Sequence, residues 1–500
     1  MRVFAFLCLV FEAAGQVTTS QYDNARTGAN LHETVLTPQN VNARQFGKIF
    51  SFRVDGDIYA QPLYLPAVEI PGKGVHNVLF IATEHDSVYA FDADGKTTEP
   101  LWHVNFLTPG AHTVSASDVQ CPFITPEIGI TPTPAIDLPT GTLYVLARTK
   151  EGRGALSGNR FVQRLHALAI TTGVEKFGGP TEIKASGFDP LRELPRAGLL
   201  LANDQVYLTW ASSCDVPTYH GWVMSYDAHT LAQTTAFNTS PDAEESGTWQ
   251  GDAAPAADEQ GNVFVVTGNG KFDAAPTGRD YGDSVLKLGR GLQVADYFTP
   301  HDQARLNAAD ADLGSGGPVL LPGHLLLVGG KGGVLYVLDR DHLGKYRPDD
   351  ARDGLDTVRL HDMFGAPAYW NGHVYVQASN DVLKDFSLDH GKLVGPVASG
   401  TQRFIDPGAT PAISANGSRN GIVWILESKG WRSPDRPAVL HAYDAANVAR
   451  EIYNSEQVSG RDRAGKCLRF AVPTVVNGRV YVGAKSEVDV YGLLPAAPAK

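Results

Sequence analysis

The sequence is short of cysteine, of charged residues and, beyond its first residues, of long apolar runs. Only 4 of its 500 residues are cysteine, and charged residues make up 19%. No Cys-x-x-Cys-His motif for haem attachment and no zinc-site spacing occurs. No later segment is long enough to span a membrane. The net charge is −12 and no concentrated basic face is visible, so a nucleic-acid partner is not expected.

The chain begins with features of a signal peptide. A basic start is followed by the apolar run 4–11 and by the small residues Ala13, Ala14 and Gly15. A buried first strand is the alternative. We predict a signal peptide over residues 1–15 and export to the periplasm or the exterior. The cysteines that remain can then form disulfides, and their odd number leaves one free or intermolecular.

One pattern of short apolar strands and polar turns repeats eight times, which points to strands joined by tight turns. The middle strands of the eight copies are residues 78–83, 143–148, 206–211, 263–268, 325–330, 374–379, 422–427 and 480–485. A first strand precedes each of them. Seven of the eight first strands carry a proline near their start, where the missing N–H is tolerated: Pro62, Pro134, Pro255, Pro318, Pro367, Pro411 and Pro473.

The two ends of the chain complement each other. The eighth copy lacks a fourth strand, and the chain ends in an Ala/Pro tail at 495–500. Residues 46–52 alternate like a strand but belong to no copy. We therefore predict an all-β fold, an eight-bladed β-propeller of four-stranded antiparallel blades over 46–494, preceded by an N-terminal segment at 16–45 and closed by the N-terminal strand. A linear β-solenoid is the alternative, but it needs shorter, more uniform repeats.

The repeat and the stretch 249–343 resemble the pyrroloquinoline quinone (PQQ) propeller superfamily, to which quinoprotein alcohol dehydrogenases belong. The resemblance implies that Trp249 lies under a bound quinone and that Asn269, in Thr267-Gly268-Asn269, ligates calcium. Thr299-Pro300-His301-Asp302 resembles the stretch before the catalytic aspartate, for which Asp310 and Asp312 are the nearest candidates. Lys331 resembles the basic residue that touches the quinone oxygens.

The implied chemistry is alcohol oxidation. Calcium and Lys331 would polarise a quinone carbonyl, and an aspartate would take the alcohol proton as hydride moves to the quinone. Each residue also has a structural interpretation: Trp249 is typical of blade packing, Asn269 of a turn, Lys331 of a soluble loop tip, and Asp310 and Asp312 of solvated loop acids.

The chain also departs from the family. The adjacent cysteine pair that covers the other face of the quinone is absent, and no carboxylate near 214–216 clearly matches the strongest calcium ligand. With no haem motif, electrons would leave through a separate partner. The resemblance therefore implies a remodelled site for PQQ and calcium; a chain that binds no cofactor is the alternative.

Loops on one face of a propeller meet at the axial mouth. Cys121 and Cys214 are the favoured disulfide there, because both fall in blades 2 and 3 on the same face; both remaining free is the alternative. Arg403 with Arg469 would suit a carboxylate, although each polar residue at the mouth is also typical of a structural ion pair. The polar candidates at the mouth are Glu84, His85, Glu127, His361, Asp362, Arg403, Asp406, Arg469 and Lys485.

Two functions remain open. The first is an exported quinoprotein-like oxidoreductase acting on an alcohol or sugar. The second is a non-catalytic propeller scaffold that binds a small-molecule ligand or a protein partner at the axial face. The series Trp249, Asn269, Asp310 or Asp312 and Lys331 favours the first, and the missing cysteine pair and carboxylate favour the second.

Overall fold

The computed structural model describes residues 15–152, 158–251, 253–348, 354–433 and 435–495. Residues 1–14, which hold nearly all of the predicted signal peptide, and the tail residues 496–500 lie outside the described residues. None of the helices in the described ranges is long and apolar enough to cross a membrane.

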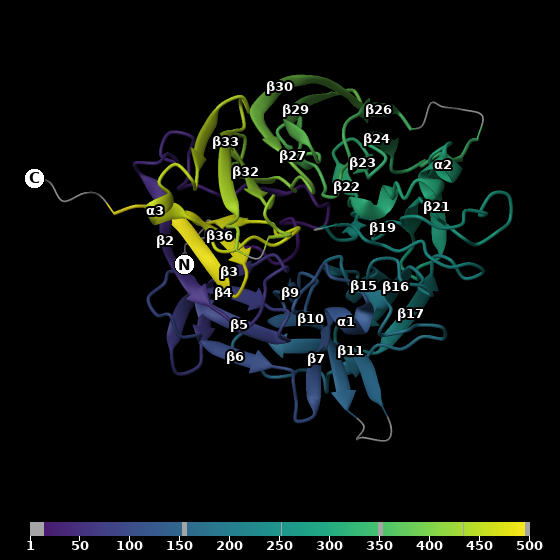
Figure 1. The fold of residues 1–500 in the computed structure, drawn as a ribbon, viewed down its shortest axis with the longest axis horizontal. Coiled ribbons are helices and arrows are strands. Elements are labelled where there is room, and N and C mark those ends of the chain that lie inside the picture. Colours follow the sequence, from purple (N-terminus) through teal and green to yellow (C-terminus); the bar gives the residue numbers. More distant parts are fainter. Residues whose placement is uncertain (1–14, 153–157, 252, 349–353, 434, 496–500) are drawn as a thin grey trace, which may run out of the picture.

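Eight small sheets are arranged around one axis, which confirms the eight-bladed β-propeller (Figure 1). The strands of each blade are given from the inner strand outward. Blade 1 consists of β3 (Leu63–Ile70), β4 (Gly74–Ala82), β5 (Ser87–Asp92) and β6 (Trp102–Asn105), and blade 2 of β9 (Ala135–Asp137), β10 (Thr142–Gly152), β11 (Asn159–Ala169) and β12 (Thr181–Glu182). Blade 3 consists of β14 (Leu200–Ala202), β15 (Gln205–Ser212), β16 (Trp222–Asp227) and β17 (Gln233–Asn238), and blade 4 of β18 (Ala256–Ala257), β19 (Val263–Val266), β20 (Val285–Leu288) and β21 (Val294–Thr299).

Blades 5 to 8 repeat the same antiparallel order. Blade 5 consists of β22 (Val319–Leu321), β23 (Leu325–Gly329), β24 (Val334–Asp339) and β26 (Asp356–Arg359), and blade 6 of β27 (Ala368–Trp370), β28 (His373–Val376), β29 (Asp381–Asp389) and β30 (Lys392–Phe404). Blade 7 consists of β31 (Ala412–Asn416), β32 (Arg419–Glu427), β33 (Val439–Asp444) and β34 (Glu451–Asn454), and blade 8 of β35 (Thr474–Val476), β36 (Arg479–Ala484), β37 (Glu487–Leu493) and β2 (Phe46–Arg53).

The predicted N-terminal strand closes the ring. Strand β2 pairs antiparallel with β37, from Phe46 opposite Leu493 to Arg53 opposite Glu487. In Figure 1 the purple start of the chain meets its yellow end at this blade. Because β2 supplies the missing fourth strand, blade 8 has the same four-stranded order as the others, as the sequence predicted.

The seven prolines stand immediately before the inner strands, one residue outside the ladder. For example, Pro62 precedes β3 and Pro411 precedes β31. The missing N–H of proline is therefore never needed for a ladder bond. In the third copy, which has no such proline, the inner strand begins at Leu200, three residues later than the sequence pattern indicated.

Apolar side chains fill the spaces between blades. Phe52 of β2 in blade 8 stacks on Phe91 of β5 in blade 1, with ring centroids 4.4 Å apart. Both are completely or almost completely buried. Burying such a side chain contributes about 1.5–3 kcal/mol, so packing of this kind between neighbouring blades stabilises the ring.

The loops of one face carry additional short elements. These are β7 (Ala111–Ser115), α1 (Ala116–Val119), β8 (Glu127–Ile128), β13 (Glu193–Leu194), α2 (Gln303–Ala308), the 3-10 helix η1 (Leu313–Ser315) and α3 (Ser459–Asp462). Strand β25 (Lys345–Tyr346) extends blade 4 at its outer edge.

The N-terminal segment does more than lead into the ring. Residues 17–30, which we call the axial plug, run once around the axis and hydrogen-bond to the inner strand of every blade. Val17 bonds to Tyr64, Thr18 to Ile136, and Asn24 to both Leu201 and Ala257. Ala25 bonds to Leu320, Thr27 to Tyr369, Gly28 to Ile413 and Asn30 to Val475. Strand β1 (Ala29–Asn30), at the end of the plug, pairs parallel with β31.

One buried arginine organises the axial plug. The guanidinium of Arg26 donates to the carbonyl of Pro255 at 2.8 Å, to Thr19 Oγ1 at 2.8 Å, and to the carbonyls of Ser20 at 2.8 Å and Asp23 at 3.1 Å. Burial lowers the pKa of Arg26 to about 10. The side chain therefore stays charged at neutral pH and ties the plug to blade 4.

Candidate functional site

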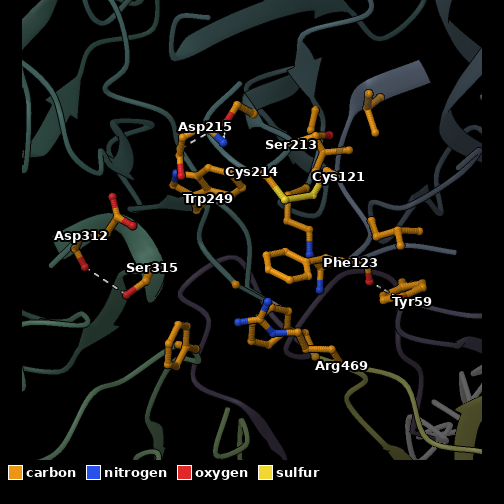
Figure 2. A pocket seen from close by; sticks show the side chains of 18 of the residues that line it. Tyr59, Cys121, Phe123, Ser213, Cys214, Asp215, Trp249, Asp312, Ser315 and Arg469 are labelled. Atoms are coloured by element: carbon orange, nitrogen blue, oxygen red, sulfur yellow. Dashed lines mark hydrogen bonds between the residues drawn. A yellow bond between two sulfur atoms is a disulfide. The ribbon is translucent and has the colours of Figure 1, made fainter. Parts of the chain in front are cut away.

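A cavity opens at the mouth of the axis on the face that carries the long loops. Its volume, counted as the space open to the centres of water molecules, is about 200 Å³. Figure 2 shows side chains of its wall. By their positions between the strands, the lining residues come from blades 1 to 6 and blade 8. The sequence-predicted residues that line this site cavity are Cys121, Cys214, Trp249, Asp310, Asp312, Lys331 and Arg469.

Trp249 lies on the segment that leads into β18. The next-but-one residue, Gly251, has φ +45° and a Cβ there would lie 1.9 Å from the Phe364 carbonyl oxygen. Only glycine permits this close approach of the two loops. The backbone of blade 4 is thereby held against blade 6, and Trp249 is placed on the cavity wall beside the disulfide.

Asp310, Asp312 and Lys331 form one hydrogen-bonded network. Lys331 Nζ is 2.5 Å from Asp312 Oδ2 and 2.9 Å from Asp310 Oδ1. Asn269 donates from its backbone N to Asp312 Oδ1 at 2.7 Å and from Nδ2 to Asp310 Oδ1 at 2.7 Å. Gly268 leaves room for this arrangement, because a Cβ there would lie 2.3 Å from Asp312 Oδ1. The four predicted polar residues therefore meet in space.

Burial sets the electrostatics of this network. It raises the pKa of Asp312, and the charge of Lys331 opposes that rise. Burial by itself would lower the pKa of Lys331, but the carboxylates of Asp312 and Asp310 outweigh it and the pKa is raised. Behind them, burial raises the pKa of Asp283 to about 8, and the nearby Asp312 adds to the rise. The network thus holds a firmly protonated lysine between two carboxylates.

The two candidate aspartates differ in what they offer to the cavity. Asp312 is 5% exposed and both of its oxygens are engaged. The side chain of Asp310 is 68% exposed, and within the described ranges only its Oδ1 is hydrogen-bonded. Asp310 therefore has a free carboxylate oxygen, whereas Asp312 holds Lys331 in place.

The only disulfide among the described residues lines the site cavity. Cys121, after α1, and Cys214, after β15, are bonded, with Cα atoms 5.5 Å apart. The third cysteine of this part of the chain, Cys467, is free and buried. A disulfide between distant cysteines therefore stands on the same wall as Trp249 (Figure 2), although no adjacent pair exists.

Several cavity residues were not singled out from the sequence. Asp215 lines the cavity, where the sequence offered no clear carboxylate; its Oδ1 accepts hydrogen bonds from Tyr219 at 2.7 Å and Ser212 at 3.2 Å. Tyr59 and Arg196 also line it, and the Arg196 guanidinium lies 5.7 Å from the Tyr59 ring. The one sequence signal for Asp215 was its position directly after Cys214, a cysteine predicted to form a disulfide between blades 2 and 3.

The other predicted mouth residues lie outside the site cavity. Glu84 is buried and accepts from Gly129 N at 2.7 Å, and burial raises its pKa to about 7. His85 Nδ1 is 2.9 Å from Glu127 Oε2. Asp406 pairs with Arg432 at 3.5 Å. His361, Asp362 and Arg403 are exposed, and Lys485 lines a neighbouring cavity. Arg196, and not Arg403, shares the site cavity with Arg469.

The cavity suits a flat, anionic aromatic molecule better than it suits a ready-made metal centre. Trp249 and Phe470 contribute aromatic rings to the cavity wall, and Lys331 and Arg196 contribute positive charge. For a cation, Asn269 Oδ1 is buried without a partner and adjoins the two aspartates. The described ranges hold no group of three or more His, Cys, Asp or Glu side chains able to bind a metal. Lys331 supplies the positive charge between the carboxylates.

Comparison with known proteins defines the fold. No family model matches the chain, and no curated protein matches its sequence. Among solved structures, quinohemoprotein alcohol dehydrogenase ADHIIG from Pseudomonas putida HK5 aligns with a TM-score of 0.62 at 14% identity, over 97% of this chain and 82% of that one. A europium-containing methanol dehydrogenase gives 0.61 at 12% identity, over 96% and 98%. BamB from Moraxella catarrhalis gives 0.53 at 14% identity, over 89% and 99%.

Fold and cavity together define an eight-bladed propeller with a polar and aromatic pocket at one axial mouth. More narrowly, the chain has the propeller fold of these dehydrogenases and of BamB. At identities this low the likeness establishes the fold alone.

Proposed function

We propose that the chain is an exported quinoprotein-type oxidoreductase that acts on an alcohol or sugar, with PQQ and calcium in a remodelled site. One observation carries the proposal: Trp249, the Cys121–Cys214 disulfide and the Lys331 network, from blades 2 to 5, line one cavity. The disulfide also supports export, because such bonds persist in oxidising compartments.

The residues have distinct roles in this proposal. Trp249 and the disulfide would hold and orient the flat ring of the cofactor. Asn269 Oδ1, which is buried without a partner beside the two aspartates, would be the ligand that this chain offers to a cation. PQQ, if bound there, would supply the two-electron acceptor for the hydride of the alcohol carbon. The free Oδ2 of Asp310 takes the alcohol proton, while Asp312 positions Lys331, whose charge stabilises negative charge developing on an oxygen.

The test begins with binding. PQQ and Ca²⁺ are added to the purified protein, and tryptophan fluorescence, quinone absorbance and dye-linked oxidation of alcohols and sugars are followed. We expect saturable quenching that Trp249→Ala reduces, and turnover that Asp310→Asn lowers by about 100-fold or more without loss of PQQ binding. Asp302→Asn, which alters a half-buried acid that pairs with Arg305 and does not line the site cavity, is the matched control. Absence of PQQ binding at millimolar concentration would overturn the proposal.

A non-catalytic scaffold is the second candidate. The observation that favours it is the poor set of metal ligands. Lys331 already pairs with the carboxylates of Asp310 and Asp312, and the described residues form no cluster of three His, Cys, Asp or Glu side chains. PQQ binding without turnover on any alcohol or sugar, with and without Ca²⁺, would support this candidate.

A further inference from the structure

A second cavity adjoins the site cavity at the same mouth. It offers about 530 Å³ to the centres of water molecules and shares Tyr59, Phe123 and Arg469 with the first. Its other side is formed by Trp431, Arg432 and Lys485. We call this second cavity the vestibule. Because the two cavities share residues, a ligand in the vestibule lies directly beside the candidate site.

The charges of the vestibule are all of one sign. Arg432, Arg469 and Lys485 line it and no aspartate or glutamate does, although the chain carries a net charge of −12. Arg432 is 3.5 Å from Asp406. No ion pair or side-chain hydrogen bond joins Arg469 or Lys485 to any other described residue. Asp406 and Asp57 act on Arg469 and Lys485 only through space, without a direct ion pair. The lining of the vestibule itself therefore presents positive charge alone.

Arg469 is held in an aromatic enclosure. Its guanidinium carbon lies 4.4 Å from the ring centroid of Phe470, 4.7 Å from Trp431, 5.2 Å from Phe123 and 5.5 Å from Phe364. Its Nε is buried and has no hydrogen-bond partner. Burial lowers the pKa of Arg469 to about 10, so the side chain stays charged at neutral pH. Ring faces attract the cation, but they offer no oxygen that could accept strong hydrogen bonds from its N–H groups.

A buried, charged donor without an acceptor is costly unless something fills the position. The planar fork of a guanidinium matches a carboxylate in two parallel hydrogen bonds. The ring faces around Arg469 would at the same time pack against an apolar body. Both features select one kind of ligand.

We propose that the vestibule binds an organic carboxylate with an aromatic or apolar body, its carboxylate on Arg469 and Lys485 and its body against Trp431 and Phe123. This goes beyond the proposed oxidation, since binding here needs neither cofactor nor turnover. In an active enzyme it would favour anionic substrates over neutral ones.

The experiment compares two small probes of the same shape. Benzoate and its uncharged counterpart benzamide are titrated into the full-length folded protein without PQQ, by calorimetry and tryptophan fluorescence. We expect benzoate to bind at least about 10-fold more tightly than benzamide, and Arg469→Met to weaken benzoate by about 10- to 100-fold while leaving benzamide unchanged. Arg403→Met, which removes an exposed arginine of blade 6, is the matched control and should change neither.

Other outcomes decide against the proposal. Equal binding of the two probes, or wild-type benzoate affinity in Arg469→Met, overturns it. Competition between PQQ and benzoate also overturns it, because Arg469 would then serve the cofactor's carboxylates. If Arg469→Met does not fold, Lys485→Met replaces it, with a loss of about 3- to 10-fold expected and an unchanged affinity overturning the proposal. Failure of PQQ to bind bears only on the proposed oxidation.

Discussion

The axial plug gives the sharpest stability prediction. Arg26 is completely buried and makes four hydrogen bonds, three of them to backbone carbonyls. Replacing it with methionine keeps most of the volume and removes every donor. The carbonyls of Ser20 and Pro255 then remain buried without this partner, at about 1–3 kcal/mol each.

Part of this loss is offset. Burial disfavours the Arg26 charge, as its pKa of about 10 shows, and methionine does not carry that penalty. We therefore expect Arg26→Met to lower the free energy of unfolding by about 2–4 kcal/mol. With an unfolding entropy of about 2.1 cal/mol/K per residue over roughly 450 cooperative residues, the melting temperature falls by about 2–4 °C.

The assay is thermal and urea unfolding followed by circular dichroism. Arg53→Met, which changes a side chain that is 83% exposed, is the control and should melt like the wild type. Arg26→Lys keeps the charge but not the fork, and should fall between the two. A melting temperature of Arg26→Met equal to that of the control would refute the view that the plug ties the blades together.

Three further changes test other parts of the structure. Asp312→Asn leaves Lys331 with only one carboxylate in a mostly buried place, so the free energy of unfolding in urea should fall by about 3 kcal/mol and the lysine pKa, followed by NMR, should fall. Asp283, with a folded pKa of about 8, keeps a proton that the unfolded chain loses near pH 4. Wild-type stability should therefore decrease between about pH 4 and pH 8, by at most about 1.4 kcal/mol per pH unit from this group, and Asp283→Asn should remove that slope from urea midpoints. The double variant Cys121→Ser, Cys214→Ser opens a loop of 93 residues, so the free energy of unfolding should fall by about 4–5 kcal/mol, matching the effect of a reductant on the wild type.

The sequence by itself determined the repeat and the way the ring closes. Strand alternation and turn residues are local signals, and a proline before an inner strand acts through its own missing N–H. The unpaired strand 46–52 and the incomplete eighth copy were sufficient to predict the pairing of β2 with β37. The cavity residues from Trp249 to Lys331 followed from a resemblance in ordered motifs, because their loops enter neighbouring blades.

Only the tertiary structure decided what those loops meet. Asp215, Arg196 and Arg469 lie in three different loops, and no sequence spacing states that the first two share a cavity with the third. The axial plug was invisible in the sequence for a different reason: most of its bonds to the eight inner strands join backbone groups, which every residue carries. Such contacts leave no side-chain pattern in the sequence, so only the tertiary structure shows that residues 17–30 bond to all eight inner strands.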